Sequence, residues 1–340
     1  MDVVGVLTGG GDCPGLNAVV RGVVARATAR HGVEVVGILD GWDGLMDGRV
    51  RPLDRSAVRG ILQRGGTILG TSRRDPYVHG DGYESVRGTL AANGIEALVV
   101  IGGDGTLRSA LRLHEEGLPV VAVPKTIDND IAGTDMTFGF DTAVQVATEA
   151  IDRLTTTAEA HNRIMLVEVM GRTKGWIAVH AGIAGGADAI LIPEAAYDLE
   201  EVARIIRSRH RHGHRYSVVV VAEGVEPPSG DLPVKLDAFG FERLGGVAHL
   251  LAPQLEALTG FETRVTVLGH VQRGGTPSAF DRVLATRFGV AAADLAVEGR
   301  FGSMVSLRGT EMVAVPLAEA CVEIRGVPPS LYDVARTFWG

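Results

Sequence analysis

The feature that most constrains the fold is a series of short apolar runs, each of which ends in glycine, proline or polar residues. The clearest are VVGVL before TGGGD, ALVVI before GGDGT, PVVAV before PKTIDND, IMLVEVM before GRTKG, YSVVVVA before EGVE, and RVTVL before GHVQRGG. Segments with helical spacing lie between them, at 16–30, 107–116, 142–157, 199–211 and 245–258. Near-continuous apolar strands that alternate with helices predict an α/β fold with doubly wound parallel sheets.

The strongest single helix prediction covers residues 14–31. Pro14 suits a first helical position, and Gly32 suits the stop that follows a last turn. No long flexible linker interrupts the pattern, and the nearest approaches to a break are the stretches 133–141 and 226–233. A chain of 340 residues with this pattern is expected to form about two domains.

Composition excludes several classes of protein. The chain has 33 Lys and Arg against 41 Asp and Glu, a net charge of −8, which argues against general affinity for nucleic acids or anionic membranes. Its two cysteines, Cys13 and Cys321, form neither a disulfide framework nor a metal-cysteine cluster. With no apolar stretch near the ~18 residues of a membrane span and no basic leader, we expect a cytoplasmic protein.

Glycine is in excess, with 46 residues in 340, and much of it gathers after the apolar runs. Residues 8–12, TGGGD, suit either a phosphate-binding loop before a helix or a tight strand-to-helix turn. In 102–106, GGDGT, the glycines allow polyphosphate to approach the backbone. Asp104 there suits Mg²⁺, and it also suits the N-terminus of the next helix, and the two roles are compatible.

Two acids and an amide follow another run in PKTIDND, residues 124–130. A carboxylate at a strand end could take a hydroxyl proton during phosphoryl transfer, while the second could orient it or hold metal-bound water. An ordinary Asn/Asp turn is the alternative.

Basic side chains form a third group, at Arg73, Arg74, Arg163, Arg172, Arg264, His270 and Arg273, several of them close to glycine. Each alone is a surface or ion-pair residue by default, but arginines at strand ends beside glycine favour phosphate binding. The combination indicates phosphoryl transfer between two anionic substrates. The basic run 204–215 is interpreted instead as a solvated helix end, with a regulatory anion site as the lesser alternative.

The motifs LTGGGDCPGLNAVVRG, GGDGT, PKTIDND, VEVMGR, AEG and LGHVQRGGTPSAFDR together resemble the 6-phosphofructokinase family over nearly the whole chain. The resemblance implies transfer of the γ-phosphoryl group of ATP to the 1-hydroxyl of fructose 6-phosphate, with Mg²⁺, in glycolysis. A non-catalytic sensor on this scaffold would not need Asp104, Asp128 and Arg172 together, which favours an enzyme.

The resemblance also implies roles for residues. Asp128 would be the proton acceptor, flanked by Thr126 and Asp130, and Arg172 would stabilise charge on the transferring group, while Asp104 would hold the metal. Donor-binding positions would be Gly11, Arg73, Arg74, Gly103, Asp104, Gly105 and Thr106. Sugar-phosphate positions would be Thr126, Ile127, Asp128, Arg163, Met170, Gly171, Arg172, Glu223, Arg264, His270, Val271, Gln272 and Arg273.

The resemblance further implies two discontinuous α/β domains, 1–138 with 255–310 and 139–254 with 311–340. It implies a homodimer or homotetramer as well, because part of the family's sugar-phosphate site comes from a neighbouring subunit. Members that use pyrophosphate generally carry Asp at the position of Gly105 and Lys at that of Lys125, whereas typical bacterial ATP enzymes carry Gly at both. Since Gly105 leaves space for a nucleotide, we predict ATP as the donor, with pyrophosphate as the alternative.

Overall fold

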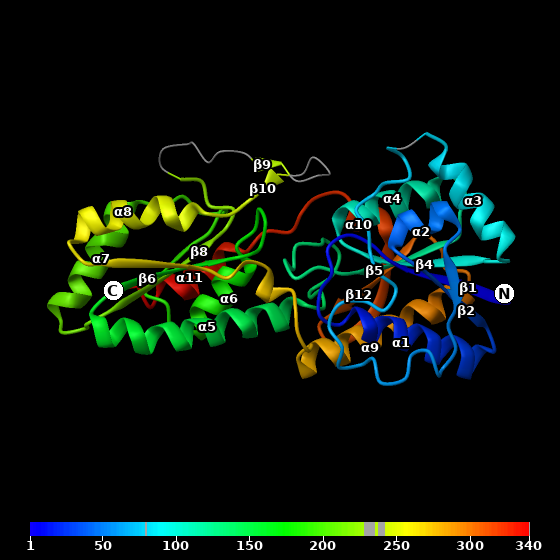
Figure 1. The fold of residues 1–340 in the computed structure, drawn as a ribbon, viewed down its shortest axis with the longest axis horizontal. Helices are drawn as coiled ribbons and strands as arrows, with labels where there is room; N and C mark the ends of the chain where they lie inside the picture. Colours follow the sequence, from blue (N-terminus) through cyan, green and yellow to red (C-terminus); the bar gives the residue numbers. More distant parts are fainter. Residues whose placement is uncertain (79, 228–234, 237–241, 340) are drawn as a thin grey trace. The chain divides into compact units, whose positions relative to one another are not determined.

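The structure is a computed structural model that describes residues 1–340 except 79, 228–234, 237–241 and 340 (Figure 1). The chain divides into two compact units. Unit 1 comprises Met1–Asp141 and Arg273–Arg325, and unit 2 comprises Thr142–Gln272 and Gly326–Gly340. Each unit is therefore assembled from segments that are far apart in the sequence.

Unit 1 is built on a seven-stranded sheet with the order β13-β12-β5-β4-β1-β2-β3. The strands are β1 (Val3–Thr8), β2 (Glu34–Ile38), β3 (Val50–Pro52), β4 (Ala97–Gly102), β5 (Val120–Pro124), β12 (Ser303–Arg308) and β13 (Glu311–Pro316). The inner pairs are parallel, whereas β3 and β13 run antiparallel at the two edges. Strands β4 and β5 are buried along their whole length, as expected for strands covered on both faces.

Helices cover both faces of this sheet. They are α1 (Leu16–Arg26), α2 (Gly41–Asp47), α3 (Gly82–Ala92), α4 (Asp104–Glu115), α9 (Ala279–Val297) and α10 (Leu317–Ala320). Helices α1 and α9 pack together on one face, and α2, α3, α4 and α10 lie on the other (Figure 1). Glycines allow α1 and α9 to approach closely, because a Cβ at Gly22 would lie 2.8 Å from the carbonyl oxygen of Thr286.

Unit 2 has a smaller sheet of four parallel strands in the order β11-β6-β8-β7. These are β6 (Ile164–Val169), β7 (Ala189–Leu191), β8 (Ser217–Ala222) and β11 (Thr263–Val267), with a separate short pair, β9 (Lys235–Leu236) and β10 (Glu242–Arg243). The helices are α5 (Phe140–His161), α6 (Trp176–Ala184), α7 (Leu199–Arg211), α8 (Val247–Thr259) and α11 (Pro329–Arg336). Helices α7 and α8 cover one face, and α5, α6 and α11 cover the other (Figure 1).

The predicted α/β fold with two parallel-sheet domains is confirmed, but local bounds differ. The first helix starts at Leu16, because Gly15 before it has a left-handed φ of 107°. It ends at Arg26 and continues as a π-helical turn, Ala27–His31, which stops at Gly32 as expected. The predicted break at 133–141 lies beside the 141/142 boundary, whereas most of 226–233 is outside the described residues.

The boundaries between the units also fall at positions different from those expected. The chain returns to unit 1 after residue 272 instead of 254, because β11 pairs with β6 and so extends the sheet of unit 2. It leaves unit 1 after residue 325 instead of 310, because β13 forms an antiparallel pair with β12. Within the described part of the chain, no helix has the length and apolar character needed to cross a membrane.

Candidate active site

Three loops of unit 1 meet at the carboxyl ends of β1, β4 and β5. The amide of Gly9 donates to the carbonyl of Ile101 at 2.9 Å, and that of Lys125 donates to the carbonyl of Gly102 at 2.9 Å. The buried side chain of Thr106 fills the space beside Gly9, where an added Cβ would lie 2.7 Å from its Cγ2. The glycine loops identified in the sequence are therefore parts of one surface, as expected at the carboxyl ends of parallel strands.

Lys125 lies beneath this surface. Its side chain is 3% exposed, and its Nζ donates to the carbonyl oxygen of Gly11. Burial lowers the pKa of the Lys125 ammonium group, and the positive charge of nearby Arg273 adds to that effect. A Cβ at Gly11 would overlap the Arg273 guanidinium, so that side chain lies directly against the first glycine loop. The structure thus brings Gly11, Lys125 and Arg273 together in unit 1.

The second glycine loop leads into α4. Gly103 precedes the helix in an extended conformation, and Asp104 is its first residue. One Asp104 oxygen accepts from Nε of Arg108 at 2.9 Å. Gly105 is exposed, and a Cβ there would meet no atom within 4 Å. The start of α4 therefore presents a carboxylate and an open backbone, with the positive end of the helix behind them.

The loop after β5 is buried and tightly held. Asp128 and Asp130 are 4% and 8% exposed, and Ile127 is 2% exposed. The amide of Asp128 donates to the hydroxyl of Thr126 at 3.0 Å. Asn129, the amide of this motif, has a left-handed φ of 52°. Its side-chain oxygen accepts from the amide of Thr137 at 3.0 Å.

The two arginines near residue 73 differ in their surroundings. Arg74 pairs with Asp43 of α2, its Nη1 lying 3.2 Å from Oδ1. Arg73 is exposed. The preceding segment is attached to the first glycine loop, since the amide of Gly10 donates to the carbonyl of Ser72 at 2.9 Å and Thr71 donates its hydroxyl proton to the carbonyl of Gly10 at 2.6 Å. Both arginines therefore follow a segment anchored to the glycine loops.

In unit 2, Glu223 after β8 organises the loop after β6. Its Oε1 accepts from the amides of Gly171 at 3.2 Å and Arg172 at 2.9 Å. Gly171 has a φ of 144° and Arg172 a φ of 51°, so the chain turns sharply here. Met170 is buried, whereas the Arg172 side chain is exposed. The predicted residues Met170, Gly171, Arg172 and Glu223 therefore form one cluster with an exposed arginine.

The two other predicted sugar-phosphate arginines of unit 2 share a carboxylate that the sequence analysis missed. Arg163 binds Glu262 through Nε at 2.6 Å and Nη2 at 3.3 Å, and Nη2 of Arg264 binds the same carboxylate. The hydrogen bond from Arg163 is the chief cause of a lowered pKa at Glu262. An alternation of charge in Glu262-Thr263-Arg264 was the available sequence signal.

The GHVQRGG segment is divided by the boundary between the units. His270, Val271 and Gln272 belong to unit 2, and Arg273 belongs to unit 1. His270 and Val271 are exposed, whereas Gln272 is fully buried and donates to the carbonyl of Gly269 at 3.0 Å.

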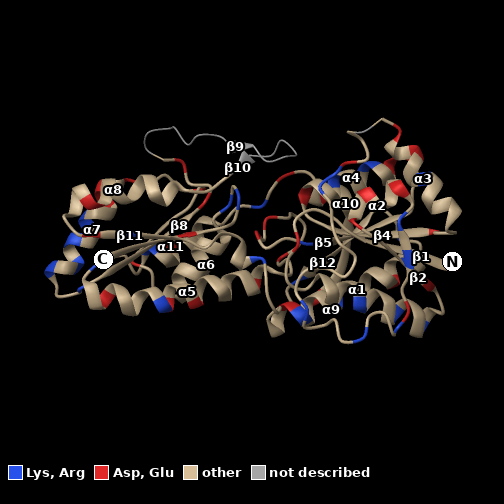
Figure 2. Cartoon of the chain, viewed as in Figure 1, with Lys and Arg blue, Asp and Glu red and all other residues tan. Residues whose placement is uncertain are grey.

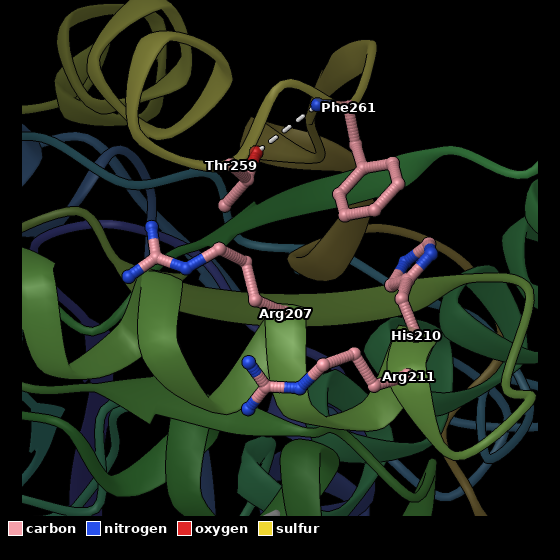
Figure 3. Close-up of a pocket in the computed structure, with 5 residues that line it drawn as sticks. All are labelled: Arg207, His210, Arg211, Thr259 and Phe261. Atoms are coloured by element: carbon pink, nitrogen blue, oxygen red, sulfur yellow. Dashed lines mark hydrogen bonds between the residues drawn. The ribbon is translucent and has the colours of Figure 1, made fainter.

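The basic run 204–215 is not simply a solvated helix end. Lys and Arg residues gather around α7 (Figure 2), but Arg209 forms a 2.8 Å ion pair with the buried Asp188. The ring of His210 stacks on Phe261 at 3.7 Å between centroids. A shallow cavity of about 420 Å³ lies here, lined by Arg207, His210, Arg211, Thr259 and Phe261 (Figure 3). Arg207 donates to the carbonyl of Leu258 in the last turn of α8, so it stabilises a helix C-terminus.

Comparison with known proteins identifies the scaffold that carries these loops. The sequence pattern of the family described as phosphofructokinase matches residues 3–296. The chain belongs to the phosphofructokinase family. A pyrophosphate–fructose 6-phosphate 1-phosphotransferase of Streptomyces coelicolor is 57% identical over 99% of both chains. An ATP-dependent 6-phosphofructokinase of Mycobacterium tuberculosis is 54% identical over 99% of both chains.

Solved phosphofructokinases share the fold. The T-state phosphofructokinase of Pichia pastoris has a TM-score of 0.84 and 34% identity, covering 99% of this chain. This chain spans 36% of that longer Pichia chain. The family resemblance predicted from the sequence is thereby confirmed, while the relatives include phosphofructokinases named for either phosphoryl donor.

Proposed function

We propose that this phosphofructokinase transfers the γ-phosphoryl group of ATP to the 1-hydroxyl of fructose 6-phosphate, giving fructose 1,6-bisphosphate and ADP. Relatives named for ATP and for pyrophosphate resemble the chain to a similar degree, so the donor is argued from its own residues. The observation that carries the proposal is the open position at Gly105, where a Cβ would meet no atom within 4 Å.

Unit 1 supplies the donor side of the proposed reaction. The glycine loops with Gly11 and Gly103–Thr106 would bind the polyphosphate through backbone amides and the N-terminus of α4. Arg73 and Arg74 would add positive charge, although Arg74 must share its guanidinium with Asp43.

Asp104 is suited to Mg²⁺. It is 29% exposed in its side chain, and Arg108 holds one of its oxygens. Among the described residues, no group of three or more His, Cys, Asp or Glu side chains could bind a metal ion. A single carboxylate still matches Mg²⁺, which commonly binds one or two carboxylates together with water and substrate phosphates. When bound, the ion would offset negative charge on the phosphates.

Asp128 is the proposed general base that accepts the proton of the 1-hydroxyl. Its buried, fixed loop suits this role, because proton transfer requires a carboxylate within hydrogen-bonding reach of the hydroxyl. Thr126 and Asp130 would hold Asp128 and its surroundings.

In unit 2, the exposed Arg172 would stabilise charge on the transferring group, with its backbone fixed by Glu223. Met170 and Gly171 would contact the sugar. Arg163, Arg264, His270 and Arg273 would bind the 6-phosphate, and the homodimer or homotetramer stays a prediction of the family resemblance.

The pyrophosphate reaction is the second candidate. The buried Lys125 favours it, since this residue type at this position is typical of the pyrophosphate-using members. Lys125 already donates to Gly11, and this position beneath the loop would not exclude a nucleotide.

A coupled assay with fructose 6-phosphate and Mg²⁺, run separately with ATP and pyrophosphate, tests the donor. We expect turnover with ATP, and turnover with pyrophosphate alone would overturn the proposal.

In Gly105→Asp, the new carboxylate repels the nucleotide, and we expect kcat/KM for ATP to fall at least ~10-fold with KM for fructose 6-phosphate nearly unchanged.

Gly88→Asp is the matched control for that variant. It introduces the same carboxylate at an exposed position of α3 where a Cβ also meets no atom within 4 Å. Parent-like ATP kinetics in both variants would remove the argument from Gly105.

A further inference from the structure

The segment Arg325–Val327 joins unit 1 to unit 2 and is anchored on both sides of the boundary. Arg325 is the last residue of unit 1, and Gly326 is the first residue of the final segment of unit 2. Arg325 contacts the loop after β5, and Val327 contacts Glu194 in the loop after β7. We call this three-residue segment the strap.

On the side of unit 1, the strap holds the proposed general-base loop through its backbone. The amide of Arg325 donates to the carbonyl of Asp130 at 2.7 Å, and its Nη2 donates to the carbonyl of Asn129 at 2.9 Å. The preceding residue, Ile324, forms an antiparallel bridge with Ile131. The guanidinium thus fixes the peptide group between Asn129 and Asp130, one residue after Asp128.

That peptide needs support because Asn129 has a left-handed φ of 52°, which a non-glycine residue rarely adopts. The Asn129 side chain is held by Thr137, while its carbonyl oxygen is held by Arg325. Rotation of this peptide would displace the neighbouring Asp128. A displacement of ~1 Å in a reacting group can lower a rate by as much as ~10²-fold.

On the side of unit 2, Glu194 ties the strap to the loop that carries Arg172. Its carboxylate accepts from the amide of Val327 at 3.0 Å and from that of Gly175 at 3.0 Å. The amide of Lys174 donates in turn to the carbonyl of Gly171 at 3.0 Å, which closes the turn around Arg172. One carboxylate, that of the exposed Glu194, therefore anchors both the strap and the start of α6.

We propose that Arg325 and Glu194 are positioning residues that, through the strap, couple the loop of Asp128 in unit 1 to the loop of Arg172 in unit 2. The proposal rests on the function proposed above for these two loops. In this proposal neither Arg325 nor Glu194 contacts a substrate, because each side chain acts on backbone groups of its loop. The covalent chain between Arg325 and Gly326 carries the coupling.

Arg325→Met in the full chain tests the first anchor, because it removes the guanidinium and keeps an apolar side chain of similar length. We expect kcat to fall ~10-fold with KM for both substrates within ~2-fold, since positioning of the base is lost and binding is not. Amide hydrogen exchange in residues 126–131 should become faster. Arg325→Lys, which retains the charge and can reach one carbonyl, should recover part of kcat.

Arg336→Met is the matched control. Arg336 is an exposed arginine of α11 whose pairing partner, Glu201, lies 3.8 Å away and outside both loops. It should keep parent-like kcat and exchange. Parent-like kcat or parent-like exchange at 126–131 in Arg325→Met would overturn the proposal. If Arg325→Met does not fold, the same two measurements on Arg325→Gln decide.

A double-mutant cycle tests the second anchor. Glu194→Gln should also lower kcat, and the double variant with Arg325→Met should lose less than the product of the two single losses, because both act through one strap. Strictly multiplicative losses would overturn the coupling. Hydrogen exchange does not depend on the donor or on Asp128 chemistry, so failure of the proposed function would leave that readout intact.

Discussion

The loop Thr126–Asp130 of unit 1 and the arginines of unit 2 are fixed in opposite ways. The loop is buried, and its hydroxyl, amide and carbonyl groups are bonded within the unit. Arg163 and Arg264 instead bind the exposed carboxylate of Glu262, and Arg172 extends from the surface. The loop is therefore preformed, whereas Arg163 and Arg264 already hold a carboxylate, which a phosphate would have to displace in the proposed function.

The largest effect is expected from removing the carboxylate of Asp128 in the preformed loop. Asp128→Ser removes the proposed base, and kcat should fall ~10²-fold or more with a modest change in KM. Steady-state kinetics with both substrates measure this. Asp135→Ser, which removes an acid 46% exposed in the same unit, should keep kcat close to that of the parent. Near-normal kcat in Asp128→Ser would show that the base is another group.

A smaller effect is expected from removing the negative charge that pairs with Arg163 and Arg264. Glu262→Gln removes the negative charge that competes with phosphate, so KM for fructose 6-phosphate should fall ~3-fold while kcat stays unchanged. Glu298→Gln, at an exposed acid paired with Arg300 in unit 1, is the control. A rise in KM would mean that Glu262 orients Arg163 for binding instead of competing with the substrate.

The smallest effect concerns the pH dependence of stability. Hydrogen bonding from Arg163 holds the pKa of Glu262 below its ordinary value of 4.5. A carboxylate with a depressed folded-state pKa stabilises the fold above its unfolded pKa, and that contribution disappears as the pH falls through the folded pKa. The Tm of the parent should exceed that of Glu262→Gln slightly at pH 7, and the two values should converge as the pH falls below 4.5 and through the lowered pKa of Glu262. A difference that persists in acid would contradict an ionic origin.

The sequence predicted those parts of the fold and site that depend on neighbouring residues. Apolar runs such as Ala97–Gly102 are buried strands, and the glycine loops that follow them meet as expected. Asp104 suited a helix N-terminus, and it is the first residue of α4, although Gly103 and not Asp104 is the capping residue. The family resemblance supplied the discontinuous arrangement of the chain, which periodicity alone could not.

Contacts between distant residues were not predictable in the same way. Arg209 was interpreted as solvated because Asp188 is remote in sequence, and Arg325 showed no motif that would connect it with Asn129. The boundary at 272 depended on the pairing of β11 with β6, a choice of partner that strand composition does not encode. In each case the residue or strand type was evident from the sequence, but its partner in the folded structure was not.

The order of the strands has a consequence for folding during synthesis on the ribosome. Strand β12 pairs with β5, so Ala122 cannot pair with Met304 until the Thr142–Gln272 segment of unit 2 and α9 have been synthesised. The core of unit 2 is likewise incomplete without α11. The hydroxyl of Tyr332 in this helix donates to the carbonyl of Ile190 at 2.8 Å. Unit 1 therefore cannot complete its sheet before β12 and β13 have been synthesised, and unit 2 cannot complete its core before α11 has been.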